Sequence, residues 1–282
     1  MANVEQRTGR INSGDVSLFY RAFGARGATP ILILHGSNYY DSYDWIPVAS
    51  ALATDREVVA PDRRGWGEST WSPSKDYSRD ALLDDMLAVI RAMQWEKPIV
   101  MGHSGAGPTI ISFAAHFPDQ ISRLVIVDSQ MLRDEDAGRG PTVGNPPLVF
   151  ESVDAAMAHF AKLSNPPRMA HDRERAIQAL VKVDGGYMLK RDPDNANKKP
   201  IGEGAQLPRR QFGDMWAELH MVRCPMMLVR GLRSDRYPPA VVERLAREHS
   251  NILHMTVDSQ HDVPGQAPDA LVAHVRKFIA AS

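Results

Sequence analysis

The sequence predicts an α/β fold, with a mostly parallel β-sheet flanked by helices and interrupted by an inserted segment. Three observations support this prediction. Short apolar runs bounded by Gly, Pro and Asp recur along the chain, segments with helical spacing lie between them, and the alternation stops after residue 130 and resumes after residue 221. Strands that alternate with helices build parallel sheets covered on both faces. At 282 residues, the chain can fold as one large domain or as one domain with an insertion.

Apolar runs predict the buried strands, at residues 16–23, 30–34, 57–60, 98–101, 124–127, 226–229 and 252–257. The clearest helix is expected over 78–93, where the apolar residues that recur three or four apart on one face are Leu82, Met86, Val89, Ile90 and Met93. Further helices are expected over 108–117, from the prolines at 238 and 239 through 246, and over 267–280. Proline suits a helix start because the N–H that it lacks is unsatisfied there in any case.

Two domains are predicted from this pattern. Residues 1–130 and 222–282 form the core, and residues 131–221 form an inserted helical cap, or lid. The insertion begins with the Pro/Gly-rich run GRGPTVGNPP and continues with helical segments near 152–163, 169–183 and 211–221. Its basic and acidic residues are equal in number, at thirteen each, so the cap shows no bias toward an anionic substrate.

Charge, hydropathy and cysteine content exclude several classes of function. Lys and Arg number 33 against 34 Asp and Glu, so no global field attracts nucleic acid or an anionic membrane. No apolar run approaches the roughly 20 residues that cross a bilayer, and the N-terminus MANVEQRTG lacks an apolar signal core. The single cysteine, Cys224, forms no internal disulfide and no multi-cysteine metal site. We expect a cytoplasmic monomer or homodimer that binds a small-molecule substrate, with no cofactor, metal, nucleic-acid or membrane partner.

Ser104 is the candidate nucleophile. The strand before it runs directly into Gly102-His103-Ser104-Gly105-Ala106-Gly107 and then into a predicted helix. A serine on a tight strand-to-helix turn needs small neighbours, because the backbones pack closely and the residue adopts a strained conformation that exposes its hydroxyl. The N–H groups at the helix start also face any negative charge that forms near the serine. An ordinary Gly-rich turn is the alternative interpretation of the motif alone.

A serine hydroxyl needs a base to remove its proton, and the base needs a third group to orient it. Asp235 and His261 lie on loops that follow the predicted strands 226–229 and 252–257. These loops belong to the carboxyl edge of a parallel sheet, where Ser104 also lies and where open α/β sheets build their sites. Upstream, a further strand ends in His35-Gly36-Ser37-Asn38 at the same edge, so the N–H of Ser37 is a candidate oxyanion donor beside that of Gly105.

The motifs PILILHG, APDRRGWGEST, PIVMGHSGAG, LVRGLRSD and QHDVP, which span nearly the whole chain, resemble those of the α/β-hydrolase fold superfamily. The closest resemblance is to its lid-bearing, HG-loop serine hydrolases of esterase or lactonase type. It implies an eight-stranded sheet, with Ser104 as nucleophile, His261 as general base and Asp235 as orienting acid. The N–H groups of Ser37 and Gly105 then form the oxyanion hole. Asp128, after the strand 124–127, is the other position from which such enzymes supply the acid.

Three residues depart from the pattern of that family. Ala106 and Gln260 stand where glycine is commoner, and Asp262 follows His261 where enzymes that cleave carbon–carbon bonds often carry tryptophan. His35 and His103 are expected to hold loops rather than to act as a second base. The other histidines show no metal-ligand spacing, and no H-E-x-x-H is present.

The expected function is a serine hydrolase that cleaves a carboxylic ester or lactone of a small to medium apolar or aromatic molecule through an acyl-enzyme on Ser104. Amide or carbamate hydrolysis, cofactor-free lyase or oxygenase chemistry, and a role as a ligand receptor stay open as alternatives. Seven side chains are candidates to line the substrate pocket, namely Asn38, Tyr39, Tyr40, Met157, Tyr187, Met215 and Trp216. Ordinary packing of the cap is the alternative role for each of them.

Overall fold

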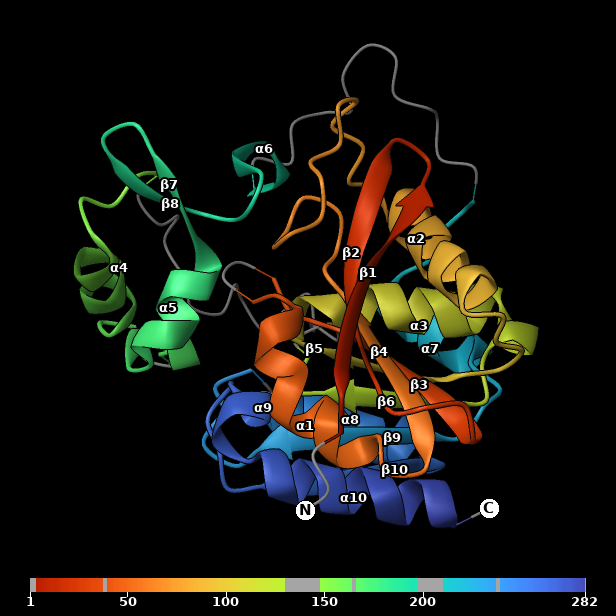
Figure 1. The fold of residues 1–282 in the computed structure, drawn as a ribbon. Helices are drawn as coiled ribbons and strands as arrows, with labels where there is room; N and C mark the ends of the chain where they lie inside the picture. The colour runs from red at the N-terminus through yellow and green to blue at the C-terminus, as the bar shows by residue number, and fades with distance from the viewer. Residues whose placement is uncertain are drawn as a thin grey trace.

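An eight-stranded β-sheet forms the centre of the computed structural model, which describes residues 4–37, 40–129, 148–163, 166–196, 210–236 and 239–281 (Figure 1). The strand order is β1-β2-β4-β3-β5-β6-β9-β10. Only the pairs β1–β2 and β2–β4 are antiparallel. The strands are β1 (Gln6–Ser13), β2 (Val16–Phe23), β3 (Ala28–Leu34), β4 (Arg56–Pro61), β5 (Ile99–His103), β6 (Arg123–Val127), β9 (Met226–Gly231) and β10 (Ile252–Val257). The predicted fold class and the eight-stranded sheet are therefore confirmed.

The edge strand β1 was the one strand of this sheet that no apolar run predicted. Its sequence, QRTGRINS, contains a single large apolar residue, Ile11, and most of its side chains are exposed. An edge strand pairs on one side only, and here it needs no apolar pattern because its partner β2 supplies the buried face.

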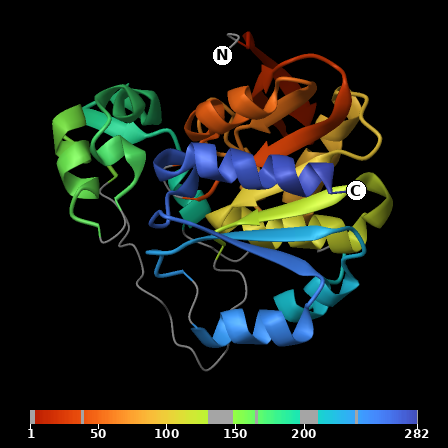
Figure 2. The ribbon, with the colours of Figure 1, turned by 90° about the horizontal axis from the view of Figure 1, so that it is seen from below.

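Helices cover both faces of the sheet, as Figure 2 shows for α8 and α10. One face packs against α2 (Arg79–Ala92), α3 (Gly107–His116), α7 (Met215–Met221) and α8 (Pro239–Glu248). The other packs against α1 (Ile46–Leu52), α9 (Val263–Gln266) and α10 (Pro268–Ala280). Within β3, Leu32 and Leu34 face the first layer while Ile31 and Ile33 face the second, so the strand is buried on both sides.

The described part of the insertion has an apolar core of its own. It contains α4 (Val153–Phe160), α5 (Arg173–Ala179), the hairpin of β7 (Leu180–Val183) and β8 (Gly186–Leu189), and α6 (Pro193–Ala196). These elements lie to one side of the sheet, at the left of Figure 1. We call residues 148–163 and 166–196 the cap. The run GRGPTVGNPP lies outside the described residues.

The prediction of a helix over 169–183 is wrong for its last four residues. Residues 180–183 form β7, and the sequence Asp184-Gly185-Gly186 turns the chain back into β8. Gly185 and Gly186 have φ angles of 84° and 148°, which residues with a side chain rarely adopt. The glycine pair is therefore a hairpin signal that overrides the helical spacing before it.

The predicted end of the insertion at residue 221 is also wrong, because α7 belongs to the core. Its residues Trp216 and Leu219 lie in the same apolar cluster as α3. Ser112 of α3 donates a hydrogen bond to Glu218 of α7, and Arg79 of α2 forms a 3.0 Å ion pair with the same carboxylate.

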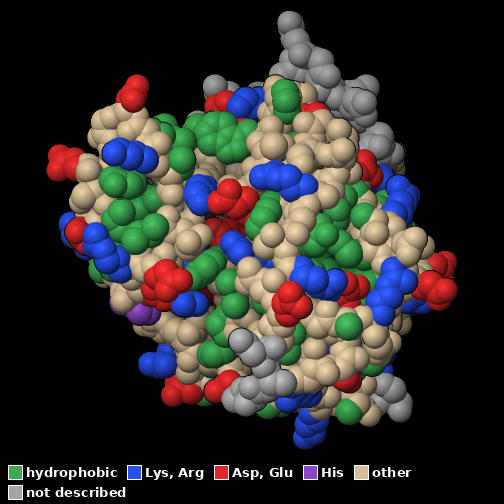
Figure 3. Space-filling model, viewed as in Figure 1, with side chains coloured by type: hydrophobic (Ala, Val, Ile, Leu, Met, Phe, Trp, Pro, Cys, Tyr) green, Lys and Arg blue, Asp and Glu red, His purple; other side chains and the backbone are tan. Residues whose placement is uncertain are grey.

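Acidic and basic side chains are interspersed on the face shown in Figure 3, in agreement with the balanced charge of the sequence. No helix in the described ranges has the length and apolar character that a membrane span requires.

A buried ion pair fixes the cap against the core. Arg175 of α5 is only 1% exposed, and its Nε and Nη2 each lie 2.7 Å from the carboxylate of Asp44. A second carboxylate, that of Asp41, lies 3.3 Å from Nη2. Asp41 caps the short turn at Ser42–Trp45 and Asp44 lies within it. This turn follows the candidate oxyanion loop, so the cap is attached next to the predicted site.

We expect Arg175→Met to lower the free energy of unfolding by about 3–5 kcal/mol, because it leaves buried carboxylates without their partner. Urea denaturation checks this. The control is Arg173→Met, on the same helix, whose exposed ion pair with Asp154 is worth less than about 1 kcal/mol. Equal effects of the two substitutions would show that the buried pair does not hold the cap.

Candidate active site

Ser104 lies on a strained turn between β5 and α3. Its φ angle is 51°, in the left-handed region that side chains other than glycine rarely adopt. The hydroxyl of Ser129 donates to the Ser104 carbonyl at 2.5 Å and so supports this conformation from the next strand. A Cβ at Gly102 would lie 2.9 Å from the Ile110 side chain, which explains the small residue before the turn. The predicted strand–turn–helix context of Ser104 is confirmed.

A chain of two hydrogen bonds connects Ser104 to a buried acid through His261. Ser104 Oγ lies 2.8 Å from His261 Nε2, and His261 Nδ1 lies 2.7 Å from Oδ2 of Asp128. Because Asp128 accepts from Nδ1–H, Nε2 is left as the acceptor for the serine proton. This arrangement matches that of a nucleophile, a base and an orienting acid.

The acid that meets His261 is Asp128, so the prediction of Asp235 for that position is wrong. Asp235 lies at the surface, in an ion pair with Arg236 at 3.2 Å. The register explains the difference. His103 of β5 pairs with Val127 of β6, and the next residues of the two adjacent strands are Ser104 and Asp128.

Asp128 is fully buried and held by two further donors. The backbone N–H of Gly231 donates to Oδ1 at 3.0 Å, and the hydroxyl of Ser234 donates to Oδ2 at 2.5 Å. Both donors come from the end of β9 and the loop after it, where Asp235 was predicted to act. That loop therefore contributes to the site by positioning the acid rather than by supplying it.

Burial sets the protonation states of the site. It lowers the pKa of His261 from 6.5 to about 3, although the charge of Asp235 acts in the opposite direction. The imidazole is therefore neutral near pH 7, as a general base must be. Burial raises the pKa of Asp128, while the hydrogen bonds from Ser234 and Gly231 favour its ionised form.

His35 and His103 hold the loops of the site, as the sequence predicted. His103 Nε2 donates to the carbonyl of His261 at 2.8 Å, and burial lowers the pKa of His103 to about 3. His35 Nε2 accepts from the backbone N–H of Arg63 at 2.9 Å. Both rings are buried, and each binds a backbone group of a neighbouring loop, which fits a loop-holding role.

The two predicted oxyanion donors lie side by side next to Ser104. A Cβ placed on Gly105 would lie 2.0 Å from Ser37 Oγ and 3.3 Å from the Ser37 nitrogen. A Cβ on Gly36 would lie 3.2 Å from the Ser104 Cβ. Only glycine at these positions allows the loop after β3 to approach the turn after β5 this closely.

The departures from the family pattern have local explanations. The N–H of Gln260 donates to Gln266 Oε1 at 2.7 Å, which holds the loop before His261 without a glycine. Asp262 accepts from the backbone N–H of Arg168 in the cap at 3.0 Å, and burial raises its pKa to about 7. The loop of His261 is therefore also attached to the cap.

The predicted pocket residues fall into three groups. Tyr40, Met157 and Tyr187 pack into or against the apolar cluster of the cap, and the Tyr40 ring meets His103 edge-to-face at 5.0 Å. The assignment of Met215 and Trp216 to the pocket is wrong, because both pack in the core with α3. The predicted residues Asn38 and Tyr39 lie outside the described residues.

In the described ranges, no group of three or more His, Cys, Asp or Glu side chains is placed to hold a metal ion.

The geometry predicts that Asp128→Asn slows the reaction of Ser104 with a fluorophosphonate about 10,000-fold, because the amide no longer holds the imidazole in the required tautomer. Asp235→Asn, the matched control on the neighbouring loop, changes the rate less than about threefold, as expected for an exposed surface charge. The pseudo-first-order rate of adduct formation measured by intact mass gives both values. If Asp235→Asn slowed the reaction more than Asp128→Asn does, the orienting acid would be Asp235.

Comparison with known proteins identifies the family of the chain. The family model described as alpha/beta hydrolase fold matches residues 29–267. A 2-(acetamidomethylene)succinate hydrolase from Mesorhizobium japonicum is 24% identical over 96% of this chain and 95% of its own length. An esterase from Mycobacterium tuberculosis is 25% identical over 95% of this chain and 87% of its own length.

Solved structures show the same fold. An E-2-(acetamidomethylene)succinate hydrolase superposes with a TM-score of 0.77 at 22% identity, covering 98% of this chain and all of the other. The thioesterase domain from the curacin biosynthetic pathway gives a TM-score of 0.76 at 20% identity, over 96% of this chain and 99% of the other. With its central sheet, its hydrogen-bonded Ser104, His261 and Asp128 and a matching family model over most of its length, the chain belongs to the alpha/beta hydrolase fold family.

Proposed function

We propose that the protein is a serine hydrolase that cleaves a carboxylic ester or lactone of a small to medium molecule through an acyl-enzyme on Ser104. The observation that carries this proposal is the hydrogen-bond chain from Ser104 Oγ through His261 to the buried carboxylate of Asp128. Its two links are 2.8 Å and 2.7 Å long, distances that suit proton transfer from a serine to a base oriented by an acid, which supports the proposal.

The reaction follows from the positions of these groups. Ser104 Oγ attacks the substrate carbonyl while His261 Nε2 takes the hydroxyl proton. The N–H groups of Ser37 and Gly105 stabilise the oxyanion, and the imidazolium returns its proton to the leaving alkoxide. Water, deprotonated by the same imidazole, then attacks the acyl-enzyme, which releases the acid and restores the Ser104 hydroxyl.

Ester or lactone cleavage is favoured over amide cleavage because an alkoxide leaves with less assistance than an amine. The relative from M. tuberculosis that is named an esterase supports this choice. Hydrolysis of an amide is the second candidate, since the name of the M. japonicum relative describes an acetamido compound as its substrate. The cap, attached beside the site through Arg175, favours small molecules over polymers.

The test is the intact mass of the wild type, Ser104→Ala and His261→Ala after exposure to a fluorophosphonate. Only the wild type gains one adduct at an appreciable rate, and peptide mapping places it on Ser104, because both the hydroxyl and the base are needed. A folded wild type that stays unmodified contradicts the proposal. Turnover of a natural substrate that survives in Ser104→Ala would instead favour lyase or oxygenase chemistry, and slow turnover with persistent ligand binding would favour a receptor.

The lowered pKa of His261 predicts the pH dependence of ester hydrolysis. Since protonation of the base stops the reaction, and burial holds that pKa below 6.5, activity persists as the pH falls through 6.5. We expect kcat/KM for p-nitrophenyl acetate to stay within about twofold between about pH 6 and pH 8. An acid limb centred at or above pH 6.5 would show that His261 is not the buried base.

A further inference from the structure

Arg63 is a buried arginine without an acidic partner. The residue follows β4 and is 7% exposed. Within the described part of the chain, no carboxylate lies at ion-pair distance from its guanidinium, and its Nε has no hydrogen-bond partner. Among the described residues, its side chain contacts Ser37 Oγ from Nη1 at 3.4 Å and stacks over Trp66, with Cζ 4.7 Å from the ring centroid. The charge of Asp85 also acts on the guanidinium, but from beyond ion-pair distance. A buried charge is costly unless it is paired, so Arg63 needs an explanation.

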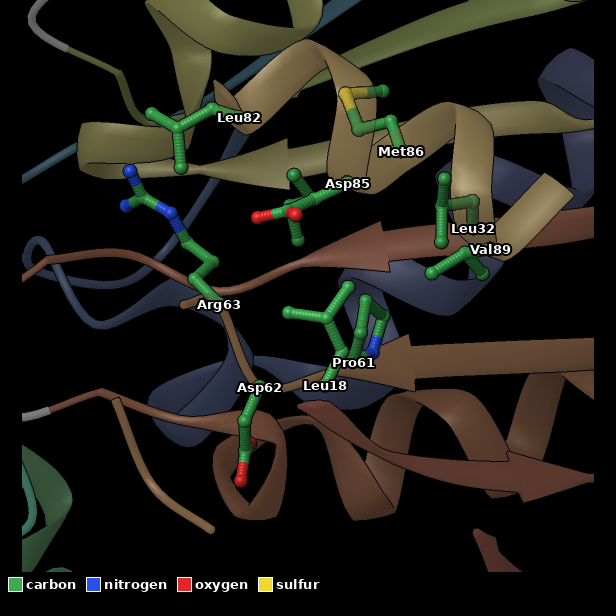
Figure 4. Close-up of a pocket in the computed structure, with 10 residues that line it drawn as sticks. Leu18, Leu32, Pro61, Asp62, Arg63, Leu82, Asp85, Met86 and Val89 are labelled. Carbon is green, nitrogen blue, oxygen red and sulfur yellow. The ribbon is translucent and has the colours of Figure 1, made fainter. Parts of the chain in front are cut away.

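The carboxylates nearest to Arg63 are already engaged by other groups. Both oxygens of Asp85 bind Arg64, at 2.7 Å to Nε and 2.8 Å to Nη2. Both oxygens of Asp62 accept backbone N–H groups, those of Ser42 at 2.7 Å and Glu68 at 2.8 Å. Figure 4 shows the Arg63 guanidinium beside Leu82, while the Asp62 carboxylate points in the opposite direction.

The guanidinium lies where a cavity meets the oxyanion loop. A small, partly open cavity lies between the sheet and α2. Asp62 and Asp85 line it, and its apolar lining residues are Leu18, Leu32, Leu34, Pro61, Leu82, Met86 and Val89. Arg63 also lines it, and on the other side it contacts Ser37, which lies directly against Gly105. One Ser37 side chain therefore separates the guanidinium from the turn that carries the nucleophile.

We propose that Arg63 binds a carboxylate of the substrate, so that the preferred substrate is an ester bearing a second, free carboxylate a few bonds from the scissile carbonyl. This inference rests on the proposed function. A planar guanidinium binds a carboxylate in a bidentate manner and keeps its stacking on the indole. One guanidinium supplies one positive charge, which favours a monoanionic carboxylate over a dianionic phosphate. The positive charge that binds the substrate carboxylate is then that of Arg63 in the core. The cap has equal numbers of basic and acidic residues and supplies no excess positive charge.

Two pairs of substrates test the proposal, because the carboxylate can belong to the acid or to the alcohol part. The first pair is monomethyl glutarate and methyl 4-carbamoylbutyrate, and the second is O-butyryl glycolate and its glycolamide. Both members of each pair are esters. They differ only in that the free carboxylate of one is a neutral carboxamide in the other. The readout is the ratio of kcat/KM for the charged ester over its neutral partner, measured for wild type, Arg63→Met and Arg63→Lys.

We expect the wild type to prefer the charged ester in at least one pair, and Arg63→Met to reduce that preference about 10- to 100-fold, mainly through KM. Arg63→Lys keeps the charge and retains part of the preference. Arg26→Met, which removes an exposed arginine, is the control and leaves the ratio unchanged. Glutarate inhibits the wild type more strongly than it inhibits Arg63→Met.

Thermal unfolding separates a binding role from a structural one. If Arg63 awaits a ligand, Arg63→Met unfolds at the same or a higher temperature, because an unpaired buried charge is replaced by an apolar side chain. A lower unfolding temperature together with an unchanged ratio would overturn the proposal and make Arg63 a packing residue. An unchanged ratio in both pairs overturns it at any stability. If Ser104 is labelled and neutral esters are cleaved without charge preference, the proposed function stands and only this inference fails.

Discussion

The hydrogen bond between His261 and Asp128 is the interaction on which the site depends. Asp128 fixes the ring so that Nε2 faces the hydroxyl of Ser104, and several other contacts of the site support one of these three residues. Ser129 holds the Ser104 carbonyl, Ser234 holds Asp128, and His103 holds the carbonyl of His261. The donors come from the loops after several neighbouring strands, so the parallel sheet is what brings them to one edge.

Buried acidic side chains next to the site bind residues of the cap. Arg175 pairs with Asp44 and Asp41 next to the oxyanion loop, and Asp262, beside the base, accepts a backbone N–H from the cap. Substitutions in the cap that disturb these contacts therefore act on the orientation of the catalytic loops as well as on the shape of the pocket. Arg63 differs from Arg175 because its guanidinium, buried beside the same loop, forms no ion pair with a carboxylate of the described residues.

The sequence was sufficient for the core of the fold and for two of the three residues in the hydrogen-bond chain. Buried parallel strands read as continuous apolar runs, and Ser104 and His261 follow such runs directly, so their common edge could be deduced. The acid was assigned to Asp235, which was wrong, because Asp128 and Asp235 both follow strands and the sequence alone does not show which of them meets His261. Only the register of β5 against β6, which depends on packing across the sheet, places Asp128 beside Ser104. The burial of α7 and the hairpin in the cap were missed because tertiary contacts decide them, with Trp216 in the core and a glycine turn at 185–186.

The central claim is that Ser104 becomes acylated during turnover. The most direct measurement is rapid-quench mass spectrometry of the wild type mixed with p-nitrophenyl butyrate. We expect a transient species that carries one butyryl group on the peptide containing Ser104, formed and lost at rates compatible with steady-state turnover. Hydrolysis that proceeds without this species, at a rate that Ser104→Ala leaves unchanged, would contradict it.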